Sequence, residues 1–170
     1  NKNEKSFLGL TIIRFAIDDI PNTLFLVEPD GSINYNNISS FSAADYAFLF
    51  SYAQLSNIEH LSWGANFKIV HRVVGDFARA WGFGLDASAQ YRPGSWFFGA
   101  MLRDVTSTFN AWSFSFSDEE KEILSATDNL IPDNSLEVTL PKLIIGAGYE
   151  WVLKKNFHII LFIFHNFFYS

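Results

Sequence analysis

The sequence predicts an all-β fold: an antiparallel transmembrane β-barrel, of which this chain supplies about seven to eight strands, with one short helix in a long loop. Three observations lead to this prediction. Apolar and polar residues alternate with the period of two that is typical of strands. Charged residues make up only 18% of the chain, against about 25% in soluble domains, while hydrophobic residues reach 49% and aromatic residues 18%. In the clearest alternating segments, the charges keep to one face.

The first expected strand covers residues 7–16. Leu8, Leu10 and Ile12 share one face with Arg14. Because a charged side chain on a lipid-facing surface is costly, the Arg14 face is expected to point inward.

The clearest strand covers residues 81–92, where large residues from Trp81 to Tyr91 alternate with small or polar ones. A segment of about eleven residues is as long as a tilted transmembrane strand, and aromatic residues are expected where such a strand crosses the two membrane surfaces. Segments 45–53, 61–73, 96–103 and 142–151 repeat this scheme.

Six charges fall on the small and polar face of these strands. They are Asp45, Lys68, Arg72, Asp86, Arg103 and Glu150. Unpaired charges in a dry core would be strongly destabilising, so the set predicts a wet barrel lumen lined by charges of both signs.

Eight aromatic residues fall on the opposite, apolar face and are expected at the membrane surfaces. They are Tyr46, Tyr52, Trp63, Trp81, Tyr91, Trp96, Tyr149 and Trp151.

The connections predict hairpins. Pro93 and Gly94 favour a tight turn at 92–95, whereas longer loops are expected at 17–42 and 113–135. Ser117 and Glu120 have the spacing of a capping box, which predicts a helix of about two turns. The adjacent acids at 18–19 are expected to shape the first loop through Asx-type hydrogen bonds rather than to bind a cation. Short turns on one side and long loops on the other are typical of outer-membrane barrels.

Several function classes are disfavoured. The net charge of −6 and the lack of a basic cluster predict no nucleic-acid partner. The chain has no cysteine, and its four histidines are scattered, so neither a metal site nor a cofactor is expected. The glycines at 82, 84, 146 and 148 lie inside strands rather than in phosphate loops. No nucleophile elbow is present, so the sequence predicts no enzyme.

The chain is expected to form one domain over residues 1–170. No secretory signal peptide is visible, and the apolar run at 157–169 is too short for a membrane-crossing helix of about 20 residues. Because this run is unbroken rather than alternating, residues 156–170 are expected to be an aberrant or truncated tail.

Four stretches carry a family resemblance. They are LGLTIIRFAIDDIPNT (8–23), FSAADYAFLFSYA (41–53), WGANFKIVHRVVGDFARAWGFGLDASAQYR (63–92) and WFFGAMLRDVTSTFNAWSFSFSDEEKE (96–122). The chain resembles the PorV/PorQ-type proteins of the Bacteroidetes, a branch of the FadL-like outer-membrane barrels, over residues 8–151.

The resemblance implies a barrel of about fourteen strands, of which this chain is a central fragment, in the outer membrane of a Gram-negative cell. Outer-membrane lipid and secretion-system subunits or exported proteins are the implied partners, and type IX protein secretion is the implied function. FadL-like transport of hydrophobic compounds is an alternative. A further alternative is a soluble, lipocalin-like barrel that binds apolar ligands, but its outer surface should be charged, whereas the expected outer face here is aromatic.

Overall fold

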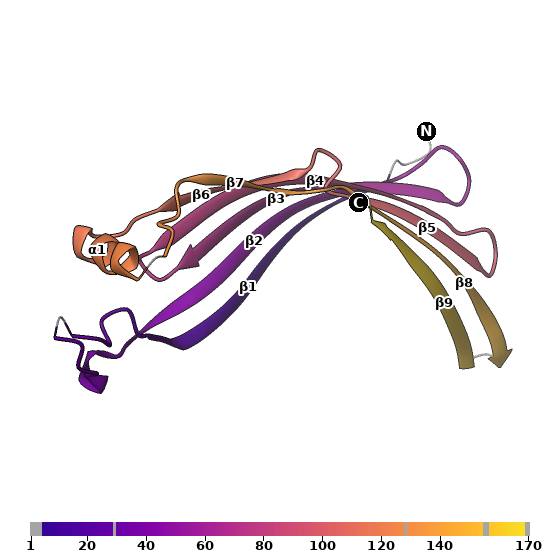
Figure 1. The fold of residues 1–170 in the computed structure, drawn as a ribbon. Helices are drawn as coiled ribbons and strands as arrows, with labels where there is room; N and C mark the ends of the chain where they lie inside the picture. Colours follow the sequence, from indigo (N-terminus) through magenta and orange to yellow (C-terminus); the bar gives the residue numbers. More distant parts are fainter. Residues whose placement is uncertain (1–4, 29, 128, 155–156, 169–170) are drawn as a thin grey trace.

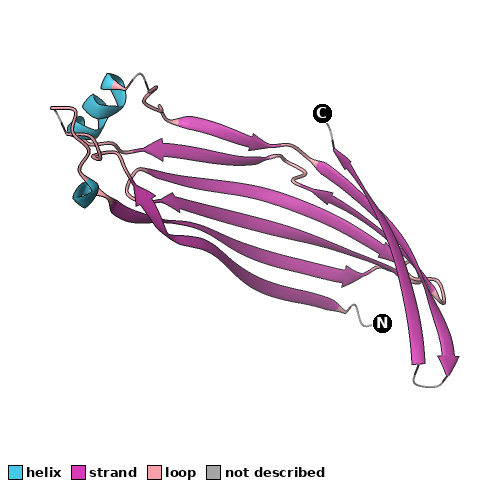
Figure 2. Ribbon diagram, turned by 60° about the horizontal axis from the view of Figure 1, so that its bottom comes forward, coloured by secondary structure: helices cyan, strands magenta, loops and turns pink. Residues whose placement is uncertain are grey.

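The computed structural model describes residues 5–28, 30–127, 129–154 and 157–168. Antiparallel β-sheet dominates these residues, and the sheet curls into part of a barrel, with one short α-helix (Figures 1 and 2). The predicted all-β class and the partial barrel are therefore confirmed.

The elements follow one another as hairpins. The strands are β1 (Ser6–Asn22), β2 (Ser39–Leu55), β3 (Leu61–Val74), β4 (Ala78–Tyr91), β5 (Trp96–Arg103), β6 (Thr108–Phe114), β7 (Ser135–Thr139), β8 (Lys142–Lys154) and β9 (Phe157–Phe168). The helices are a single 3-10 turn, η1 (Tyr35–Asn37), and α1 (Asp118–Ala126).

The sheet order is β1-β2-β3-β4-β5-β8-β9, and β6 pairs with β4 and β7. β5 pairs with the last residues of β4, whereas β6 pairs with its first residues. β5 and β6 therefore together occupy one position beside β4. In the same way, β7 and β8 pair with β6 and β5. The described sheet therefore has seven wall positions, within the predicted range.

The two ends of the sheet differ. The loops at 23–38 and 115–134 lie at one end, here called the loop end, with the short turn at 75–77 (Figure 1). The turns at 56–60 and 92–95 lie at the opposite, turn end. This asymmetry agrees with the sequence prediction, although the first loop is shorter than the expected 17–42 because β1 continues to Asn22.

The acids at 18–19 lie inside β1 and do not shape the loop, so that prediction is wrong. The β1–β2 register shifts between Ile17 and Ile20, and Asp19 has a left-handed φ of 57°. These observations place the two acids in a β-bulge. The turn after β1 is instead stabilised by Asn22, whose Oδ1 accepts a hydrogen bond from the Leu24 N–H at 3.0 Å.

Polar side chains within the loop at 23–38 form hydrogen bonds with one another. One carboxylate oxygen of Glu28 accepts hydrogen bonds from the amides of Asn34 and Asn37, at 2.9 and 3.0 Å. These bonds favour the charged form, so they hold the pKa of Glu28 below its ordinary value. Hydrogen bonds from Ser32 lower the pKa of Asp30 in the same loop.

The predicted helix and its capping box are confirmed. The Ser117 hydroxyl accepts from the Glu120 N–H at 3.2 Å, and the Glu120 carboxylate accepts from the Ser117 N–H at 2.7 Å. These bonds satisfy two backbone donors that a helix start leaves free.

Residues 157–168 of the expected tail form a strand, β9. β9 pairs with β8 along its length, so residues 157–168 extend the sheet. Both faces of this strand are apolar, which explains why the sequence shows no alternation there. The other residues of the expected tail, 156, 169 and 170, lie outside the described residues.

Candidate functional site

The two faces of the sheet are distinguished by contacts between strands that are not neighbours. Lys68 on β3 reaches Asp104 after β5, and Arg72 on β3 reaches Glu137 on β7, in both cases across β4. Side chains on separated strands meet only on the inside of a curve, so these residues define the concave face.

A buried ionic group, here called the mid-wall cluster, lies on the concave face. It comprises Lys68, Asp86, Asp104, Thr108 and Asn110, each 4–8% exposed. The ammonium of Lys68 lies 2.9 Å from Asp86 and 2.5 Å from Asp104. Asp86 also accepts from the Asp104 N–H at 2.9 Å, and the Thr108 hydroxyl donates to Asp104. Formal charges of one cation and two carboxylates leave the cluster at −1.

A break in the wall strand builds this cluster. Asp104 and Ser107 both have left-handed φ angles, 53° and 59°, and the Val105 N–H donates to the Leu85 carbonyl at 2.8 Å. The resulting turn separates β5 from β6 and brings Asp104 next to Lys68.

Glycines on β4 make room for the cluster. A methyl group at Gly84 would overlap the Thr108 hydroxyl and lie 2.6 Å from Lys68 Cε. A methyl group at Gly82 would overlap Asn110 Oδ1, a buried atom with no hydrogen-bond partner in the described structure. Gly82 and Gly84 are therefore positions of close approach, inside a strand as the sequence predicted.

A second ionic group, here called the rim network, lies on the same face toward the loop end. Arg72 donates to Asp45 at 3.0 Å and to Glu137 at 3.1 Å, while its guanidinium lies 5.0 Å from the centre of the Trp112 ring. Trp112 Nε1 also donates to Glu137 at 2.9 Å. Ala80, fully buried, is the β4 residue that pairs with both Arg72 and Trp112, and its small side chain lets them meet above the strand.

The six charges predicted for the lumen all fall on the concave face by register. Asp45 and Arg72 belong to the rim network, and Lys68 and Asp86 to the mid-wall cluster. Glu150 pairs with His158 at 2.7 Å on β9. The other charge, Arg103, is exposed and interacts electrostatically with Asp104.

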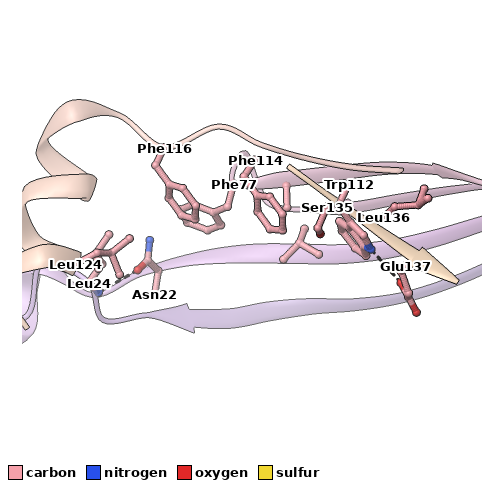
Figure 3. Close-up of a pocket in the computed structure, with 12 residues that line it drawn as sticks. Asn22, Leu24, Phe77, Trp112, Phe114, Phe116, Leu124, Ser135, Leu136 and Glu137 are labelled. Carbon is pink, nitrogen blue, oxygen red and sulfur yellow. Dashed lines mark hydrogen bonds between the residues drawn. The ribbon is translucent and has the colours of Figure 1, made fainter. Parts of the chain in front are cut away.

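An apolar cleft of about 770 Å³ lies at the loop end, beside the rim network (Figure 3). One wall is a row of aromatic rings in which Phe77 and Phe114 each stack on Phe116, at 6.0 and 6.5 Å. Leu24 from the first loop and Leu124 from α1 also line it. The volume is that of a small-molecule site.

The convex face is apolar and open. Leu10, Ile12 and Phe83 are each more than half exposed. Large exposed apolar surfaces of this kind mark contact with a membrane or another protein.

The eight predicted interfacial aromatics share the convex face and form two groups. Toward the loop end, Tyr46 and Trp81 stack on the two sides of His71, at 6.3 and 4.0 Å. Toward the turn end lie six residues, several in ring contact. They are Tyr52, Trp63, Tyr91, Trp96, Tyr149 and Trp151.

Arg14 contradicts the sequence prediction, because its face is the convex one. It pairs with Tyr46 in the β1–β2 register and donates to the Tyr46 hydroxyl at 3.3 Å. The apolar residues Leu8, Leu10 and Ile12 lie on the same face, so pairing with the aromatic side of β2 outweighs the cost of one charge. Arg79 on β4 is a second convex-face cation, in register with Val73.

Sequence reasoning missed six concave-face residues. They are Asp104, Thr108, Asn110, Trp112, Glu137 and His158. The alternation of Ser135, Glu137 and Thr139 carried a signal for β7. By contrast, nothing local to Asp104 indicates that it would meet Lys68.

No metal-binding group of three or more acids or histidines occurs in the part of the chain that the structure describes. Among the same residues, no helix is long and apolar enough to cross a membrane. Comparison of the chain with protein-family models, with curated proteins and with solved structures gives no match.

Proposed function

We propose that this chain forms part of the wall of an outer-membrane β-barrel of the PorV/PorQ type, and that the protein is a component of type IX secretion. The observation that carries the membrane placement is the opposition of the two faces. From β2 to β8, one face presents large apolar side chains between two aromatic groups, and the other gathers paired charges.

The dimensions support this placement. Trp81 and Tyr91 are ten residues apart on β4, which corresponds to about 33 Å along a strand. A strand tilted by about 40° would then span roughly 25 Å, the height of the apolar band of an outer-membrane barrel. The loop end would face the cell exterior, because outer-membrane barrels carry their long loops there.

Fractionation tests the membrane placement. The protein is expected in the outer-membrane pellet, resistant to carbonate extraction and released by detergent. A protein that stays soluble without detergent and fractionates with the periplasm would instead support the lipocalin-like alternative.

Gene deletion tests the secretion role. Deletion is expected to block export of proteins that carry the C-terminal secretion signal, while an unrelated outer-membrane protein assembles normally. Normal export of the signal-bearing proteins would rule out this role.

FadL-like transport of hydrophobic compounds is the second candidate function, and the apolar cleft favours it. The cleft is lined by aromatic and aliphatic side chains at the loop end, where a compound arriving from outside would first meet the barrel interior. Uptake of an apolar compound that falls on gene deletion while secretion continues would favour this candidate.

A further inference from the structure

The apolar cleft beside the rim network has a charge balance that restricts what it can bind. Glu137 is the one ionisable side chain among its lining residues within the described structure. No lysine, arginine or histidine lines the cleft there, so a bound anion would find no direct cationic partner.

The cation of the rim network is already neutralised. Arg72 donates from Nε to Asp45 and from Nη1 to Glu137, and its guanidinium packs on the Trp112 ring. Together Asp45, Arg72 and Glu137 have a formal charge of −1. A ligand carboxylate at the end of the cleft next to the rim network would therefore meet a net negative charge. Burying an unpaired charge there is strongly unfavourable.

The side chains that line the cleft favour an apolar ligand. The rings of Trp112 and Phe114 stack at 6.1 Å and continue the aromatic row formed with Phe116, while Leu124 of α1 also lines the cleft (Figure 3). Ser135 and the Asn22 side chain supply polar groups without charge.

We infer that this cleft binds uncharged apolar molecules and discriminates against apolar anions such as long-chain carboxylates. This inference rests on the second candidate function and names the substrate class of that site. Glu137 is the selectivity residue, because it holds Arg72 and makes the polar end net negative.

Two fluorescent probes with the same aromatic framework test the inference. N-phenyl-1-naphthylamine is uncharged, whereas 1-anilinonaphthalene-8-sulfonate carries a sulfonate. Binding is measured with the full protein in detergent, and micelle background is removed by subtracting the signal of protein-free micelles. Leu124→Trp, in which the larger side chain fills the cleft, is the blocked variant. Leu130→Trp is the matched control, because Leu130 is 94% exposed and does not line the cleft.

The uncharged probe is expected to bind the wild type at least about tenfold more tightly than the sulfonate. Glu137→Gln removes one negative charge and leaves Arg72 with a single carboxylate partner. It is expected to raise affinity for the sulfonate about tenfold and to change affinity for the uncharged probe little.

Equal affinity of the wild type for the two probes would overturn the inference. An unchanged probe preference in Glu137→Gln would overturn the selectivity role of Glu137. Unchanged binding in Leu124→Trp would show that the probes bind elsewhere. Circular dichroism of each variant separates these outcomes from misfolding, and none of them alters the fractionation result that tests the membrane placement.

Discussion

Replacing Lys68 by methionine removes the cation of the mid-wall cluster while keeping a side chain of similar length. The ammonium lies between Asp86 and Asp104, and all three side chains are at most 10% exposed. In the variant the two carboxylates would face each other without the ammonium between them. The Asp104 N–H and the Thr108 hydroxyl would still donate to them, but these groups carry no full charge.

The magnitude follows from the separations. At 2.9 and 2.5 Å, each ion pair has a Coulomb attraction of roughly 6 kcal/mol at an effective dielectric constant of about 20. Desolvation of the three ions offsets much of this attraction. Since removing one partner leaves buried charge uncompensated, Lys68→Met is expected to lower the free energy of unfolding by about 3–5 kcal/mol.

Urea unfolding in detergent micelles, followed by tryptophan fluorescence, measures the loss. Lys121→Met is the matched control, because Lys121 pairs with Asp118 at 3.3 Å on the exposed surface of α1 and its loss should cost at most about 1 kcal/mol. Adding Asp104→Asn to Lys68→Met removes one of the two uncompensated carboxylates and is expected to recover part of the stability. Equal stability of the Lys68 and Lys121 variants would refute the assignment of this cluster as a stabilising ionic centre.

Three further outcomes can be tested. Gly84→Ala is expected to lower the free energy of unfolding by about 1–3 kcal/mol through overlap with the mid-wall cluster. Gly99→Ala should be nearly neutral, because its methyl group would meet no heavy atom within 4 Å beyond the adjacent residues. Equal losses of stability in chemical unfolding would contradict this expectation. Because hydrogen bonds depress the pKa of Glu28, they stabilise the 23–38 loop above the ordinary glutamate pKa, and this contribution is lost as pH falls through the lowered value. The protection factors of the loop amides, which are corrected for the pH dependence of intrinsic exchange, should therefore fall in acid, and Glu28→Gln should remove that dependence. Leu85→Lys on the convex face should impair outer-membrane assembly, because a lysine facing lipid costs about 2–4 kcal/mol. Ser88→Lys on the concave face of the same strand should be tolerated. Similar assembly of the two variants would argue against a lipid-facing convex surface.

Period-two alternation was sufficient to predict most strands and the face of each predicted lumen charge. A strand has only two faces, so one aromatic face on β4 fixes the faces of the strands paired with it. The charges of Lys68 and Asp86 could thus be placed on a common face before any contact between them was known.

The remaining features depend on pairing that no local pattern encodes. Arg14 lies on the convex face because β1 aligns its apolar residues with Tyr46 and the aromatic side of β2. The mid-wall cluster requires the break between β5 and β6, which places Asp104 opposite a gap left by Gly84. The β9 strand has two apolar faces, so its sequence carries no alternation to detect.

Accessibility along β4 tests the lipid-facing convex surface most directly. The chain has no cysteine, so single cysteines at Phe83, Leu85 and Ala87 on the convex face, and at Ser88 and Gln90 on the concave face, can each carry a nitroxide label in lipid vesicles. Oxygen should collide preferentially with the three convex labels, and a water-soluble nickel chelate with the two concave labels. Equal access of the chelate to both sets of labels would contradict the proposed placement of this wall in the membrane.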